Sequence, residues 1–323
     1  MLTRYEFELL SYLEMSGDGR YSVRELSDTL CISGTMIMNC LETLLDRGLL
    51  GTAGSQDPSL SSFVAADFEL FLTSLGREAL EPFRVRRAII VAAGFGSRMM
   101  PATADRPKPM VRVNGVRIID TLLDALLAVG IEDIVIVGGY RFEKLKELKK
   151  DQPTLRFIEN PDFDTMNNIS SAMLALDELR GGCYFCEADL YVSHPENVIR
   201  KYQFSSNILG SYSMETDDWS FKMKDGYLSD YQKGNTYCYN YYGISYWTAE
   251  DCEKLRKDFS DVFYGPGGKD YFWEYVPFVL RKEHYKVEIR PCRKEDIMEI
   301  DNYYELAQLD PGYHGSGKNE AAL

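Results

Sequence analysis

This 323-residue sequence lacks a signal-peptide pattern and any run of about 18 or more apolar residues, so we expect neither a secretory leader nor a membrane span. The formal net charge of −14 opposes a general affinity for nucleic acid or for anionic membranes. Seven cysteines, an odd number without regular spacing, indicate reduced thiols in a cytoplasmic protein. Cys183 and Cys186 form a C-x-x-C pair on a predicted strand, where they would point to opposite faces, so we expect no metal or redox role for them.

Two common phosphate-binding motifs are also missing, because neither G-x-x-x-x-G-K-[ST] nor G-x-G-x-x-G occurs. In their place, the apolar run 88–92 leads into the loop Gly94-Phe95-Gly96-Ser97-Arg98. Glycines let backbone N–H groups converge on a ligand, and an arginine adds a fork of donors for phosphate oxygens. Further on, Lys108 lies between two prolines that stiffen its backbone. Together these features predict a polyphosphate site.

This stretch resembles the signature of the nucleotidyltransferases that join a nucleoside triphosphate to a phosphorylated small molecule. The resemblance implies an α/β fold, a Rossmann-like domain with a mixed central sheet, whose glycine loop holds the triphosphate and the base. It implies catalytic roles for Arg98, Lys108 and Asp189. The nucleotide contacts that it implies are Ala92, Ala93, Gly94, Gly96, Ser97, Arg98, Lys108, Asn168 and Ser170.

Residues 1–83 are predicted to form a domain of their own. Their pattern predicts a helix over 5–13, a second from a Ser22–Glu25 capping box to about Leu30, and a third between Ser33 and Gly48. Strands are predicted at 49–50 and 68–72 around a long polar loop, and a closing helix follows them. This order resembles a small winged helix-turn-helix domain of bacterial regulators.

The charge of this domain opposes the DNA binding that its resemblance implies. Up to Phe83 it has five arginines, no lysine and 13 acidic residues, a net charge of −8. Since DNA affinity depends mainly on neutralising phosphates, nucleic acid is not the expected partner. A docking or dimerising role, with a homodimer as one form of it, is favoured.

Residues 84–312 alternate strands and helices, as α/β domains do, and residues 313–323 are predicted to be a disordered tail. Strands are expected at 88–92, 134–137, 155–158, 184–188, 208–212 and 241–247, with a hairpin around Asp225-Gly226 and a last strand ending near 299–301. Helices are expected at 118–129, 142–149, 169–179, 249–257 and 270–280.

Two aspartates follow predicted strands, where ligands of open α/β sheets bind. Asp189 ends an apolar strand, and Asp301 follows the run 297–300. The resemblance implies that both hold Mg²⁺, the ion that neutralises a triphosphate. Either residue could instead only cap the segment that follows it.

The acceptor side is rich in aromatic residues. Trp219, Trp247 and Trp273 all lie in the C-terminal third among many tyrosines, and for Trp247, on an apolar strand, we expect core packing. Rings with nearby carboxylates suit a quaternary ammonium. The segments 160–171, 187–189, 218–219, 270–274 and 299–301 come in the order seen in bacterial CTP:phosphocholine cytidylyltransferases. That resemblance implies acceptor contacts from Asn167, Trp219, Tyr271, Trp273 and Glu274, although Tyr271-Phe272-Trp273 could present either aromatic pair.

The sequence therefore predicts an enzyme that makes CDP-choline and pyrophosphate from CTP and phosphocholine. Two alternatives stay open. The acceptor could be a sugar 1-phosphate or 2-aminoethylphosphonate, whose primary ammonium would rely on carboxylates such as Glu215 or Glu274. The chain could instead be a DNA-binding regulator that uses the nucleotidyltransferase-like domain as a ligand sensor.

Overall fold

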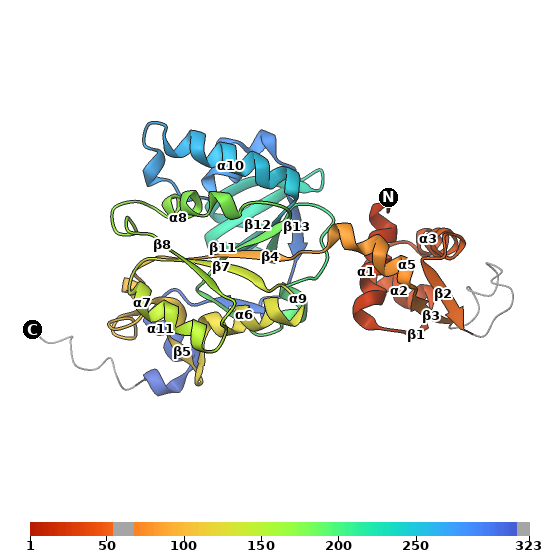
Figure 1. Cartoon of the computed structure of the whole chain (residues 1–323), viewed down its shortest axis with the longest axis horizontal. Helices are drawn as coiled ribbons and strands as arrows, with labels where there is room; N and C mark the ends of the chain where they lie inside the picture. The colour runs from red at the N-terminus through yellow and green to blue at the C-terminus, as the bar shows by residue number, and fades with distance from the viewer. Residues whose placement is uncertain (54–67, 315–323) are drawn as a thin grey trace, which may run out of the picture. The chain divides into compact units, whose positions relative to one another are not determined.

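The computed structural model describes residues 1–53 and 68–314, and Figure 1 shows their arrangement. The chain consists of two compact units, Met1–Arg84 and Val85–Leu323, divided one residue beyond the predicted boundary. Within the described residues, every helix is too short or too polar to cross a membrane.

The first unit contains helices around a core of leucines and a small sheet. Its elements are α1 (Arg4–Ser16), β1 (Gly19–Tyr21), α2 (Val23–Leu30), α3 (Gly34–Asp46), β2 (Leu50–Ala53), β3 (Phe68–Leu72) and α5 (Ser74–Leu80). The helices begin where the sequence predicts, because the hydroxyls of Ser22 and Ser33 accept backbone N–H groups of the first turn. The sheet has the order β1-β3-β2, and the sequence did not predict β1.

The second unit is an α/β domain. Its strands are β4 (Arg87–Ala92), β5 (Arg112–Val113), β6 (Val116–Arg117), β7 (Asp133–Gly138), β8 (Arg156–Glu159), β9 (Cys183–Glu187), β10 (Leu190–Val192), β11 (Asn207–Lys224), β12 (Tyr227–Trp247), β13 (Glu288–Pro291) and β14 (Ile297–Glu299). Its helices are α6 (Ile118–Ala128), α7 (Phe142–Leu145), α8 (Ile169–Leu174), α9 (Pro195–Val198), α10 (Ala249–Phe263) and α11 (Tyr303–Leu309).

Seven strands form the central sheet in the order β11-β13-β12-β9-β4-β7-β8. The strands β9, β4, β7 and β8 are parallel, whereas β12 runs antiparallel to β9, so the sheet is mixed. In addition, β10 pairs with β14, and the backbone N–H of Ile300 donates to the carbonyl of Asp189 at 3.1 Å. This pairing brings the segments that follow β9 and β14 together beside the sheet.

Both faces of the sheet are covered, as Figure 1 shows with α6 and α7 on one side and α8 and α10 on the other. The alternation along β4 explains this arrangement, because successive side chains of a strand point to opposite faces. Ile90 is buried in the cluster that includes α6, whereas Ile89 is buried in the cluster that includes α8 and α10.

Several predicted elements differ in length from the observed ones. The hairpin strands β11 and β12 extend far beyond 208–212 and 241–247 to a tight turn at Asp225-Gly226, where both residues have positive φ. The predicted helix over 270–280 is instead a 3₁₀ turn (Gly268–Asp270) and a π-helical turn (Val276–Leu280), because Pro277 has no N–H to donate.

The predicted disordered tail does not begin at Tyr313. Its hydroxyl donates to the carbonyl of Arg112 at 2.8 Å, and its own carbonyl accepts from the Tyr303 hydroxyl. Residues 315–323 of that tail and residues 54–67 of the predicted polar loop lie outside the described residues.

Candidate active site

A cavity of about 700 Å³ opens in the second unit at the carboxyl ends of β4 and β9. One end is lined by the glycine loop 92–98 and by parts of the segment 160–171. The other end is lined by residues of the β11–β12 hairpin and by Phe272 and Glu274. Ligands of open α/β sheets bind at this edge of the sheet.

The glycine loop follows β4 directly, and all of its residues from Ala92 to Arg98 line the cavity. Gly96 has φ +63°, and a Cβ at this position would lie 3.0 Å from the Cβ of Lys108. A larger residue would therefore be strained and would push against the lysine. The predicted nucleotide residues Ala92, Ala93, Gly94, Gly96, Ser97, Arg98, Lys108, Asn168 and Ser170 all lie on the wall.

Lys108 is buried between two carboxylates. Its Nζ donates to Asp189 Oδ2 at 2.7 Å and to Asp301 Oδ1 at 3.1 Å, and Asp301 Oδ1 also accepts from Arg98 at 2.9 Å. Burial alone would lower the pKa of Lys108, but the charges of Asp189 and Asp301 outweigh it, so the pKa is raised. The lysine is thus a fixed positive charge that faces the cavity.

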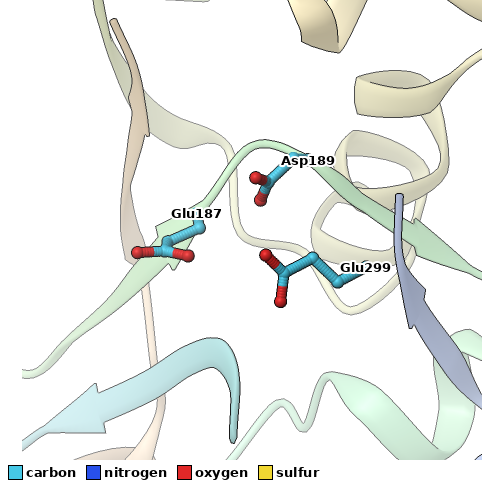
Figure 2. Close-up of side chains that lie close together, drawn as sticks. All are labelled: Glu187, Asp189 and Glu299. Carbon is cyan, nitrogen blue, oxygen red and sulfur yellow. The ribbon is translucent and has the colours of Figure 1, made fainter. Parts of the chain in front are cut away.

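Three carboxylates lie together beside this lysine. Figure 2 shows the side chains of Glu187, Asp189 and Glu299 close together, and one oxygen of each lies within 4.8 Å of the others. Removal from water, followed by the charges of Asp189 and Asp301, raises the pKa of Glu299 well above its usual range. A cation at this point would relieve that repulsion.

These residues fit a divalent metal ion. Asp189 Oδ1 is buried and has no hydrogen-bond partner among the described residues, while its other oxygen binds Lys108. Carboxylate oxygens are the ligands that hard divalent cations prefer. The structure brings Asp189 together with Glu187 and Glu299, whereas Asp301 pairs with Arg98 and Lys108, and the metal pair Asp189 and Asp301 stays a prediction.

The other end of the cavity combines aromatic rings with a buried carboxylate. Trp219 stacks on Tyr231 with ring centroids 5.1 Å apart, and Tyr241 donates through its hydroxyl to Glu274 Oε1 at 3.3 Å. Glu274 is 3% exposed and lies against the carboxyl group of Glu187, and no N–H or O–H group among the described residues donates to its Oε2. Burial raises the pKa of Glu274, and burial followed by the charge of Glu274 raises the pKa of Glu187 well above its usual range. This end can therefore accept a cation.

Three predicted acceptor residues are absent from the cavity wall. Trp273 is fully buried, with its ring 4.5 Å from that of Phe185, so it is a core residue. Tyr271 packs on Tyr275, and Glu215 is exposed on β11. The structure does not bring these three residues to the cavity, because residues 271–275 form no regular helix whose phase the sequence could indicate and Glu215 is exposed on β11.

Phe272, which the sequence leaves open as a member of the acceptor pair, lines the cavity together with Tyr231 and Tyr241, which were not predicted as site residues. Glu187 and Glu299 were also missed, although the spacing Glu-x-Asp is the same at 187–189 and 299–301. That repeated spacing, at the ends of two apolar strands, was a usable signal.

The segment 160–171 is held by its own polar side chains. Asn160 Nδ2 donates to the hydroxyls of Ser170 and Ser171 at 2.9 Å, and Asn168 Oδ1 accepts from the backbone N–H of Trp273 at 2.7 Å. Asn167 lines the cavity, and its Nδ2 donates to the carbonyl of Asp270. The segment therefore joins the two ends of the cavity.

Comparison with known proteins finds similarity along most of the second unit's length. A model of the MobA-like NTP transferase domain matches residues 88–201. The 2-aminoethylphosphonate cytidylyltransferase of Lancefieldella rimae is 36% identical over 229 residues, which span 70% of this chain and 92% of that protein. The choline-phosphate cytidylyltransferase of Streptococcus pneumoniae is 30% identical over 231 residues, 69% of this chain and 96% of that protein.

Among solved structures, the CTP:phosphocholine cytidylyltransferase of Streptococcus pneumoniae superposes with a TM-score of 0.65 at 27% identity. The match covers 71% of this chain and 98% of that one. This similarity confirms the predicted α/β fold with a mixed central sheet.

Proposed function

This chain belongs to the cytidylyltransferases with a MobA-like NTP transferase domain, and from that premise we propose that it transfers a cytidylyl group from CTP to 2-aminoethylphosphonate. A phosphonate oxygen attacks the α-phosphorus of CTP and forms a new P–O bond. The bond from the α-phosphorus to the oxygen that bridges it to the β-phosphorus breaks, and pyrophosphate leaves with that electron pair. Because a phosphonate is anionic near neutral pH, the attack needs no general base.

The residues at the glycine loop suit this reaction, whose catalysis consists of positioning and charge stabilisation. Backbone N–H groups of the loop and the Arg98 guanidinium would bind the β- and γ-phosphates. Lys108, held by two carboxylates, would stabilise charge that develops around the α-phosphorus. A divalent ion such as Mg²⁺ held by Asp189 and Glu299 would supply further positive charge to the triphosphate.

The choice of 2-aminoethylphosphonate as the acceptor rests on Glu274 Oε2, a buried oxygen to which no group among the described residues donates. A primary ammonium has three N–H donors and can satisfy this oxygen, whereas a quaternary ammonium has none. A buried carboxylate oxygen without a donor, as Oε2 is here, is costly, and a charge-assisted hydrogen bond removes that cost. The relative from Lancefieldella rimae, whose name gives 2-aminoethylphosphonate as its substrate, supports the same acceptor.

Phosphocholine is the second candidate. The rings of Trp219, Tyr231, Tyr241 and Phe272 line the acceptor end, and they would attract a trimethylammonium group through cation–π contacts. The names of the choline-phosphate cytidylyltransferases of Streptococcus pneumoniae and Haemophilus influenzae, which are 30% and 28% identical to this chain, support this acceptor.

Pyrophosphate release tests the acceptor directly. The assay contains CTP and Mg²⁺ with 2-aminoethylphosphonate, its N,N,N-trimethyl counterpart, phosphocholine or glucose 1-phosphate. We expect the highest kcat/KM with 2-aminoethylphosphonate, at least about 10-fold above its trimethyl counterpart, since one lost charge-assisted hydrogen bond has about this effect. A higher kcat/KM with both trimethylated acceptors than with 2-aminoethylphosphonate would favour phosphocholine. No pyrophosphate release with any acceptor would contradict cytidylyl transfer.

The variant Glu274→Gln tests the residue itself. We expect kcat/KM for 2-aminoethylphosphonate to fall about 30-fold, because the ammonium loses its buried counter-charge. The KM for CTP should change less than the KM for 2-aminoethylphosphonate, because Glu274 lies beside Glu187 and not on the glycine loop. Glu215→Gln is the matched control, since this glutamate is exposed outside the cavity. An unchanged preference for the primary over the trimethylated amine in Glu274→Gln would contradict the assignment.

A further inference from the structure

An aromatic side chain lies in the middle of the glycine loop. Phe95, between two glycines, is 50% exposed and lines the cavity at the end opposite Glu274. One face of its ring stacks on Tyr140, with centroids 4.7 Å apart and planes 27° apart. Phe163 packs beside it, with centroids 5.4 Å apart, and also lines the cavity. The rings come from three separate connections that follow β4, β7 and β8.

This group of three rings is fixed by contacts outside the cavity. The Tyr140 hydroxyl lies 3.1 Å from the carbonyl oxygens of Thr103 and Ala104, and its backbone N–H donates to Ala93 at 3.2 Å. Space for Phe163 depends on Gly139, because a Cβ there would lie 2.5 Å from the Cβ of Phe163. The rings are therefore positioned before any ligand arrives.

We propose that Phe95 and Phe163 form the surface on which the base of the nucleotide stacks, an inference that rests on the proposed use of CTP. A phenylalanine that is stacked on one side and half-exposed on the cavity side offers an open π-face. Any base can stack on such a face, and the neighbouring backbone N–H groups and Arg98 suit the triphosphate of the same nucleotide. Held between Gly94 and Gly96, the ring adds affinity for the base at the point where the loop binds phosphates.

The test measures binding to the full-length protein by calorimetry, with CTP and with inorganic triphosphate as probes. Phe95→Leu keeps an apolar side chain but removes the π-face. We expect it to weaken CTP binding about 5- to 100-fold, the range of base–aromatic stacking, and to change triphosphate binding less than about 2-fold. Phe95→Tyr should stay within about 3-fold for CTP. Phe71→Leu, at an exposed phenylalanine of the first unit, is the matched control and should change neither.

Other results would overturn the inference. Equal CTP affinity in Phe95→Leu and the wild type would mean that the base does not stack there. An equal loss for CTP and triphosphate would mean that the ring only supports the loop. If Phe95→Leu does not fold by circular dichroism, Phe163→Leu makes the same comparison with the same expected and contrary results. A folded wild type that binds no CTP would contradict the proposed function itself, which is a distinct outcome.

Discussion

The two carboxylate oxygens of Asp189 have different surroundings. Oδ2 accepts from Lys108 at 2.7 Å, whereas Oδ1 is buried without a partner beside Glu187 and Glu299. A buried carboxylate oxygen in this state costs free energy unless a cation or donor reaches it. The arrangement therefore favours a metal ion on the Glu299 side of Asp189, and it leaves Asp301 to hold Lys108 and Arg98.

The variant Glu299→Gln separates these two roles. We expect the Mg²⁺ concentration for half-maximal activity to rise at least about 10-fold, because even second-shell changes cost that much metal affinity. Asp301→Asn should instead lower kcat with a smaller change in the Mg²⁺ requirement, because its partners are Lys108 and Arg98.

Titration of activity with Mg²⁺ measures both effects, and Glu295→Gln, at an exposed glutamate, is the control. If Asp301→Asn raised the Mg²⁺ requirement and Glu299→Gln did not, the metal pair predicted from the sequence, Asp189 and Asp301, would be favoured.

Residues of the glycine loop could be predicted from the sequence because they are consecutive, so one strand-loop motif places them all on one wall. The acceptor end could not be predicted in the same way. Trp219 comes from β11 and Phe272 and Glu274 from the segment 271–275, and which residues of that segment face the cavity depends on a backbone that is neither helix nor strand. Trp273 is as aromatic as Trp219, yet it is a core residue because its backbone is anchored to Asn168.

At the scale of elements, the α/β alternation was predictable but the pairing of short strands was not. The three-residue strands β10 and β14 pair through Leu190 and Glu299, which are far apart in the sequence. No pattern in the local sequence predicts a contact between such short segments. This pairing nevertheless places Asp301 against Lys108, so the site depends on a contact that only the folded chain reveals.

At the ends that lie away from the cavity, the strands β4, β7 and β8 are joined by an ion-pair network. Arg156, which begins β8, donates to both oxygens of Glu178 at 2.6 and 2.8 Å and to Asp133 at 2.6 Å, and Asp133 also accepts from Arg87. The hydrogen bonds to Arg156 lower the pKa of Glu178. Burial would raise the pKa of Asp133, but Arg156 and Arg87 outweigh it and lower the pKa. The network ties β4, β7 and β8 together away from the cavity.

The variant Arg156→Leu should lose stability in a pH-dependent way. Both carboxyls have lower pKa values in the folded state than their unfolded values of about 3.9 and 4.3, so they stabilise the fold above those values. That stabilisation is lost as the pH falls through the folded pKa values. Because Arg156 is 43% exposed and water screens it, we expect a loss of about 1 kcal/mol at pH 7 that shrinks below about pH 4.

Urea unfolding at pH 7 and at pH 3.5 measures this difference. Arg293→Leu, which removes an exposed ion pair, is the control and should differ little from the wild type at either pH. A loss in Arg156→Leu that is the same at both pH values would mean that the side chain stabilises the fold by packing and not by charge.

At the scale of the whole molecule, the division into two units separates the chemistry from the N-terminal part. Every residue that lines the cavity belongs to Val85–Leu323, and this unit has its own buried core on both faces of the sheet. The predicted winged-helix interpretation of the first unit stays a prediction. Its five arginines against 13 acidic residues still oppose binding to DNA, and a docking or dimerising role is the one we favour.

A fragment of residues 85–323 tests whether the second unit suffices for the reaction. It begins at Val85, whose backbone N–H donates to the carbonyl of Lys201 at 2.9 Å, so the cut leaves β4 and its neighbours intact. We expect a folded fragment with kcat/KM for CTP and 2-aminoethylphosphonate within about 3-fold of the full chain, because no residue of the cavity wall is removed. Pyrophosphate release from both proteins, together with thermal unfolding of the fragment, measures this. A fragment that folds but loses more than about 10-fold in kcat/KM would show that the first unit acts on catalysis, and a gel shift of the full chain at low salt would then test whether nucleic acid is the signal that it receives.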